Sequence, residues 1–136
     1  MPPVIENSML APCGVDCMVC YRHVRQQKVC PGCRNENENK TKSCLACEIK
    51  DCEQAGEIGF CFLCAQFPCT RIKKLDKSYK MRYGVSLMEN SWLAKDAGVE
   101  VLMEQEQKRR ACTVCGGVVS LNTGICSECG QEKQRP

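Results

Sequence analysis

The amino-acid sequence predicts a small α+β fold that is stabilised by metal ions more than by a large apolar core. The chain has 136 residues and 15 cysteines. Without the cysteines, its apolar share is roughly a third, below that of an ordinary globular domain. Hydrophobic periodicity indicates two or three helices, and two Cys-x2-Cys pairs flank a short hairpin near the C-terminus. We expect a multi-cysteine metal-binding body at 1–70, a helical segment packed on it at 71–110, and a zinc ribbon with a tail at 111–136.

The body is defined by eleven cysteines between Cys13 and Cys69. Several form Cys-x2-Cys pairs, in which two thiolates of one turn can bind the same ion. A Cys-x2-Cys-x4-Cys unit begins at Cys44 and returns at Cys61. Each copy has three sulfurs, so it must borrow a ligand, keep an open position or share a site with the other copy. The predicted ligands of the body are Cys13, Cys17, Cys20, Cys30, Cys33, Cys44, Cys47, Cys52, Cys61, Cys64 and Cys69.

The single histidine, His23, follows Cys20 at the spacing of a ligand. With His23, the eleven cysteines would fill three four-ligand sites. A lone histidine is also common as an ordinary surface or core residue. Both interpretations stay open.

Zinc is the metal we expect in several sites, because paired thiolates in tetrahedral geometry favour it. The alternative is a [4Fe-4S] cluster on Cys13, Cys17 and Cys20, whose spacing resembles that of the radical S-adenosylmethionine enzymes. Those enzymes need a partial barrel longer than this chain. The alternative is therefore an iron–sulfur protein of electron transfer.

A disulfide scaffold is the other interpretation of a short cysteine-rich chain. The first residues have neither the basic nor the apolar region of a signal peptide, and the cysteine count is odd. No apolar stretch approaches the ~20 residues that a membrane span needs. We therefore expect reduced thiols in a cytoplasmic protein that does not enter a membrane.

The first predicted helix covers residues 70–82, where Ile72, Leu75 and Tyr79 share one face. A second begins after Ser86, because Ser86-Leu-Met-Glu89 is a capping box. It should run to about residue 97, where Gly98 ends or kinks it.

A third helix is expected after Gly98, with Val99, Leu102 and Met103 as its apolar stripe. Two Glu-to-basic pairs at i,i+4 support it, Glu104 with Lys108 and Glu106 with Arg110. The residues that we expect between the packed helices are Trp92, Leu93, Leu102 and Met103.

The C-terminal motif has the most specific spacing in the chain, with predicted ligands Cys112, Cys115, Cys126 and Cys129. Each Cys-x2-Cys pair is followed by glycine, which adopts positive φ without strain and lets a backbone N–H approach a thiolate. Residues 122–124 have turn chemistry between short apolar runs. This pattern is typical of a zinc ribbon.

No catalytic constellation is present in the sequence. A hydrolytic triad has no candidate base besides His23, and neither a P-loop nor a dinucleotide-binding fingerprint occurs. An open position in a three-cysteine site could serve catalysis, although three thiolates more often belong to a structural site. We predict no catalytic residue, and the question of an enzyme stays open with the balance against it.

Basic residues follow Cys69 and are opposed in that segment by Asp76 alone; they are Arg71, Lys73, Lys74, Lys77, Lys80 and Arg82. Basic helices beside zinc knuckles bind nucleic-acid phosphates. The net charge of +3 is modest, so the alternative is a solvated helix face.

Several motifs together resemble one known family: Cys13-Gly-x2-Cys17-x2-Cys20, Cys30-Pro-Gly-Cys33, Phe60-Cys61-x2-Cys64-x2-Phe67-Pro68-Cys69, Trp92, Gly98 and Cys112-x2-Cys115-Gly-Gly. They resemble the prokaryotic domain-of-unknown-function family 3795. The resemblance implies metal binding and a cytoplasmic setting, and it implies no activity.

The sequence thus predicts a zinc-binding protein that acts as a non-catalytic interaction module. A protein partner is the first expectation and nucleic acid, bound through Arg71, Lys73, Lys74, Lys77 and Lys80, the second. The alternative function is iron–sulfur redox chemistry at the N-terminal cysteines.

Overall fold

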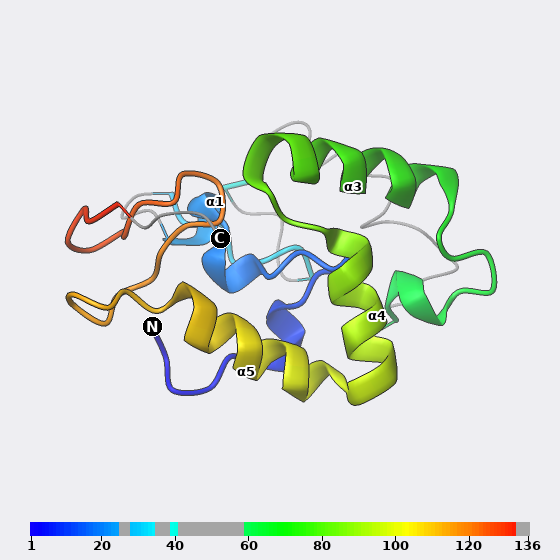
Figure 1. Cartoon of the computed structure of the whole chain (residues 1–136), viewed down its shortest axis with the longest axis horizontal. Helices are drawn as coiled ribbons and strands as arrows, with labels where there is room; N and C mark the ends of the chain where they lie inside the picture. The colour runs from blue at the N-terminus through cyan, green and yellow to red at the C-terminus, as the bar shows by residue number, and fades with distance from the viewer. Residues whose placement is uncertain (25–27, 35–38, 41–58, 133–136) are drawn as a thin grey trace.

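The computed structural model describes residues 1–24, 28–34, 39–40 and 59–132. Three longer helices enclose the N-terminal segment (Figure 1): α3 lies along one edge, α5 along the opposite edge, and α4 joins them. The C-terminal loops lie at the end of the molecule away from α4. The helices of this part of the chain are α1 (Tyr21–Val24), α3 (Thr70–Tyr83), α4 (Leu87–Ala97) and α5 (Val99–Arg110), and its 3-10 turns are η1 (Asn7–Met9), η2 (Cys17–Val19) and η4 (Cys61–Leu63).

Helix α3 matches the predicted helix to within one residue at its C-terminal end. Ile72 is fully buried, and Leu75 and Tyr79 pack against the same core. The helix ends at Gly84, whose φ of 68° is left-handed and whose N–H donates to the Lys80 carbonyl at 3.1 Å. Glycine ends a helix in this conformation without the strain that a Cβ brings.

Helix α4 begins as the capping box predicts. The Ser86 hydroxyl accepts a hydrogen bond from the backbone N–H of Glu89 at 3.1 Å, which satisfies one of the N–H groups that lack a partner within the first turn. The helix ends at Ala97, and Gly98 follows with a φ of 104°. Helix α5 starts directly after this glycine.

The contact between α4 and α5 differs from the prediction at one residue. Leu102 and Met103 are buried, and Leu93 packs against them. Trp92 is 44% exposed instead, and its ring is nearly perpendicular to that of Phe67, with 6.5 Å between the centroids. The inward face of α4 is formed by Leu87, Ser91 and Ala94, which are spaced i, i+4 and i+7, and Trp92 lies one position off that face.

Two apolar clusters combine residues from distant parts of the sequence. The larger joins Cys13, Val19 and Ile72 to Val118 and Leu121 from the C-terminal unit. The smaller is formed by Ile5, Leu10, Phe62, Ala94, Leu102 and Met103. The three predicted segments therefore share one core.

Strand pairing in the described residues is limited to isolated bridges. Three of these bridges lie in the C-terminal unit, namely Ala111 with Val118, Val119 with Cys126, and Ile125 with Glu132. The chain turns at each Cys-x2-Cys pair, so the runs between turns are too short for a regular ladder. The described part of the fold is helical, and the sheet of the expected α+β class is not found there. No helix among these residues has both the length and the apolar character to cross a bilayer.

Candidate metal centre

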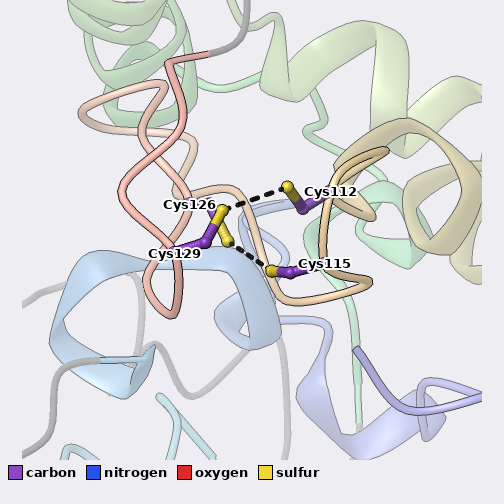
Figure 2. A group of neighbouring side chains, drawn as sticks. All are labelled: Cys112, Cys115, Cys126 and Cys129. Atoms are coloured by element: carbon purple, nitrogen blue, oxygen red, sulfur yellow. Dashed lines mark hydrogen bonds between the residues drawn. The ribbon is translucent and has the colours of Figure 1, made fainter.

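Four cysteine thiols converge at the C-terminal end of the chain. The Sγ atoms of Cys112, Cys115, Cys126 and Cys129 all lie within 4.8 Å of one another. Figure 2 shows the side chains turned toward a common centre, with Cys112 and Cys129 3.7 Å apart and Cys115 and Cys126 3.5 Å apart. In a tetrahedral zinc thiolate with bonds of about 2.3 Å, neighbouring sulfurs lie about 3.8 Å apart. The cluster therefore fits a metal ion of this kind.

The first Cys-x2-Cys turn is closed by backbone hydrogen bonds. The Cys112 N–H donates to the Gly117 carbonyl at 2.8 Å, and the Gly116 N–H donates to the Cys112 carbonyl at 2.9 Å. Gly116 has a φ of 77°, as predicted for a glycine after the second cysteine. The Gly117 N–H then reaches the Cys115 sulfur at 3.3 Å.

The second turn repeats this pattern. The Cys126 N–H donates to the Gln131 carbonyl at 2.9 Å, and the Gly130 N–H to the Cys126 carbonyl at 3.1 Å. Gly130 also has a φ of 77°, and the Glu128 N–H donates to the Cys126 sulfur at 3.5 Å. Two similar turns thus present their sulfurs to each other.

The N–H groups around these sulfurs favour thiolates. Burial raises the pKa of Cys126, but hydrogen bonds from the N–H groups of Cys129 and Glu128 lower it. The net result is a pKa lowered to about 6. Backbone N–H groups also lower the pKa of Cys112. The N–H of Gly117 lowers the pKa of Cys115, yet hydrogen bonds to the neighbouring thiols raise it overall, to about 12. Two thiols of the set are thus disposed to ionise before a cation stabilises the others.

Helix α5 positions the first turn. The helix ends at Arg110, whose carbonyl accepts from the Val119 N–H at 2.8 Å. Glu106, buried within the helix, holds the guanidinium of Arg110 at 3.7 Å, which confirms one of the two predicted i,i+4 pairs. Glu104 and Lys108 form no ion pair within the described part of the chain.

The C-terminal unit is joined to the N-terminal segment by backbone contacts. The Leu121 N–H donates to the Val19 carbonyl at 2.9 Å. The Asn122 side chain accepts from the Tyr21 N–H at 2.9 Å, at the start of α1. The amino group of Met1 donates to the Gly116 carbonyl at 2.9 Å. The C-terminal unit that carries the four-thiol cluster is therefore packed against the N-terminal segment.

The N-terminal cysteines gather in the larger apolar cluster. Cys13, Cys17 and Cys61 are buried there, and Cys33 packs against them. The Cys33 N–H donates to the Cys17 sulfur at 3.4 Å. The hydrogen bond between the two side chains, together with burial, raises the pKa of Cys17.

Arg34 lies beside these thiols, a role that sequence reasoning missed. Its Nε donates to the Leu10 carbonyl at 2.7 Å and its Nη2 to the Gly59 carbonyl at 2.8 Å, with the guanidinium over the Phe60 ring. Burial lowers the pKa of Arg34, while nearby thiols act in the opposite direction. These thiols belong to Cys17, Cys13, Cys33 and Cys61.

The remaining predicted ligands are only partly placed. Cys20, Cys64 and Cys69 are half-buried and Cys30 is buried, whereas Cys44, Cys47 and Cys52 lie outside the described residues. Apart from the four-thiol cluster, the described residues contain no second group of three or more possible ligands that converge in this way. Metal binding by the upstream cysteines stays a prediction.

His23 lies beside Cys30. Its Nδ1 is 2.7 Å from the Cys30 carbonyl oxygen, which can only accept, so Nδ1 donates. Nε2 is then the nitrogen with a lone pair in the neutral ring.

Asp16 was missed by sequence reasoning, although it lies within the first cysteine motif. It is buried, and its Oδ1 accepts from the Met18 N–H at 3.0 Å to cap η2. Burial, with a smaller effect from Glu106, raises the pKa of Asp16 to about 7. The electrostatic interaction between Asp16 and Glu106 links the first cysteine motif to α5.

Fold and cluster together define a small, cysteine-rich helical protein with a four-thiol group that can hold a metal ion. Residues 9–74 match the model of a family described as protein of unknown function (DUF3795), which confirms the resemblance seen in the sequence. The matched residues include all eleven upstream cysteines and end before the four-thiol cluster, so Trp92, Gly98 and the C-terminal motif lie beyond them. No curated protein and no solved structure matches the chain.

Proposed function

We propose that this chain is a zinc-binding protein in which the C-terminal cluster forms a zinc ribbon and the folded whole serves as a non-catalytic interaction module. The observation that carries the proposal is the convergence of four sulfurs at separations of 3.5 and 3.7 Å across the two turns. Four thiolates fill a tetrahedral shell and leave no position for water or substrate. Such a closed site is structural.

Zinc at this site would stabilise the fold directly. Two of its ligands come from the turn after α5 and two from the last turn, so the ion would link two segments whose own apolar cluster consists of Cys112, Val119 and Cys126. Structural zinc contributes an apparent ~10 to 16 kcal/mol near neutral pH. Four thiolates also suit iron, so the metal must be measured.

Metal analysis of an anaerobically purified sample tests the proposal. We expect zinc without stoichiometric iron or sulfide, and no visible absorption. A brown sample with iron and sulfide would instead support the alternative, an iron–sulfur protein with a cluster on Cys13, Cys17 and Cys20.

A variant assigns one ion to the C-terminal cluster. Cys126→Ser should lose one zinc ion per chain relative to the wild type. Val114→Ser is the matched control, because Val114 is exposed and lies between two ligands; it should keep the full zinc content. Equal zinc content in all three proteins would contradict the proposed site.

A further inference from the structure

Helix α3 carries a basic surface, which we call the α3 basic face. All its members are exposed; they are Arg71, Lys73, Lys74, Lys77, Lys80 and Arg82. The one acid of the helix, Asp76, is 5% exposed and accepts hydrogen bonds from Ser86 and Met88 at the start of α4. The outer side of α3 therefore has no acidic side chain of its own helix to balance its charge.

Three of the four lysines of this face are aligned. Lys73, Lys77 and Lys80 are spaced i, i+4 and i+7, which places them along one line of the helix over about 10 Å. Ile72 and Tyr79 point to the core, and α3 lies at an edge of the molecule (Figure 1). Lys80 pairs with Asp76 at 3.4 Å, whereas Lys73 and Lys77 form no ion pair with any described residue.

The composition of this face favours a nucleic acid over a protein as its partner. The residues between the lysines include Ser78, and Met81, 78% exposed, is the one large apolar side chain that stands out from the described part of α3. Protein interfaces are depleted of lysine and depend on buried aromatic and apolar anchors. Protein–nucleic acid interfaces are polar and strongly positive.

We propose that the α3 basic face binds the backbone phosphates of a nucleic acid. This inference rests on the proposed function, because it names the partner of the interaction module. Each strand of a duplex carries one phosphate per ~3.4 Å of its axis, so a lysine line of about 10 Å spans roughly three phosphates of one strand. Lysine contacts of this kind position a nucleic acid without reading its sequence. The binding is therefore sequence-independent and sensitive to salt.

The test measures binding of the zinc-loaded, full-length chain to fluorescent duplex DNA and to single-stranded RNA, by anisotropy between about 50 and 200 mM salt. We expect the affinity to fall linearly with salt on a double logarithmic scale. Each phosphate that a variant no longer neutralises reduces this slope by ~0.9 on a duplex and by ~0.7 on a single strand. The expected change in slope therefore differs between the two ligands. Lys73→Gln/Lys77→Gln should bind more weakly and flatten the slope by about the amount expected for two phosphates.

The matched control removes the same charge elsewhere. Lys95 on α4 and Lys108 on α5 lie outside the α3 basic face, and Lys95→Gln/Lys108→Gln should keep most of the wild-type affinity and slope. An equal loss in both double variants would overturn the inference, because net charge alone would then explain the binding. So would a wild-type protein that binds neither nucleic acid, or one that binds poly-glutamate and not nucleic acid, which would assign an acidic protein partner.

Zinc content, measured on the same samples, separates this inference from the proposed function. A zinc-loaded protein that binds no nucleic acid overturns the inference alone. A wild-type protein without zinc contradicts the proposed function, whatever its binding.

Discussion

The Asp76 carboxylate in α3 accepts a hydrogen bond from the Ser86 hydroxyl at 3.0 Å, and Ser86 in turn caps α4. The same Oδ1 atom accepts from the Met88 N–H at 3.0 Å. Burial raises the pKa of Asp76, but these hydrogen bonds and Lys80 lower it. Their combined effect is the larger one, so the pKa lies below its ordinary value of 3.8. The ionised form is therefore the one that joins the two helices.

Asp76→Ala should lower the free energy of unfolding by about 3 kcal/mol, because two hydrogen bonds to a charged group are removed and each contributes at least about 1.5 kcal/mol. The folded-state pKa of Asp76 lies below its unfolded value, so the stability that the carboxylate contributes is fully present at neutral pH. It is lost as the pH falls through the folded-state pKa. Denaturant unfolding at neutral pH measures the change. Asp96→Ala, at an exposed position in α4, should change stability by at most about 0.5 kcal/mol; similar losses in both variants would contradict the role of Asp76.

Gly14, in the first cysteine motif, lies against α4. Its φ is 99°, and a Cβ there would lie 2.7 Å from the Leu87 carbonyl oxygen and 2.8 Å from Ser91 Oγ. Gly14→Ala should therefore lower the free energy of unfolding by about 2–4 kcal/mol, through backbone strain and overpacking. Gly84→Ala is the control, because Gly84 has a φ of 68° and nothing within 4 Å of the added Cβ. It should cost only the strain of about 1–2 kcal/mol, and an equal loss would show that packing against α4 is unimportant.

The features that sequence reasoning predicted correctly depend on neighbours in the chain. Ser86 and Glu89 are three residues apart, and the bond between them forms whenever the helix does. The C-terminal thiols converge because each pair shares a turn and a following glycine. Local spacing is sufficient for such features.

The features that it missed depend on tertiary packing. Asp76 looks like one more charge on a solvated helix until α4 is placed beside α3. Trp92 looks like a core residue, but its position on α4 falls outside the inward face. Asp16 is buried and Arg34 half-buried, and both interact with residues far away in sequence. No periodicity within their own segments carries that information.

Glu106 is a buried carboxylate that stabilises the end of α5. It is 3% exposed and lies 3.6 Å from Arg109 and 3.7 Å from Arg110. Glu106→Ala leaves the largely buried Arg110 without its partner, while it also removes the repulsion between Glu106 and Asp16. We expect a net loss of about 2 kcal/mol, smaller than the roughly 3–5 kcal/mol typical when a buried pair is broken.

Glu104→Ala is the matched control for this change, since Glu104 is exposed on the same helix. Its effect on unfolding should stay within about 0.5 kcal/mol. If Glu106→Ala unfolds at the wild-type denaturant concentration, the buried pair contributes nothing to stability.

A substitution at Leu121 tests metal binding and the docking of the C-terminal unit separately. Its side chain is 4% exposed in the larger apolar cluster, and its N–H bonds to Val19. Leu121→Ala should lower the free energy of unfolding by about 2–4 kcal/mol, through reduced burial and the cavity that remains. The zinc content should not change, because the four ligands lie within 18 residues and their turns close on themselves. Ile125→Ala, at a position 43% exposed, should keep both stability and zinc. Loss of zinc from Leu121→Ala under native conditions would show that the cluster needs the N-terminal body in order to form.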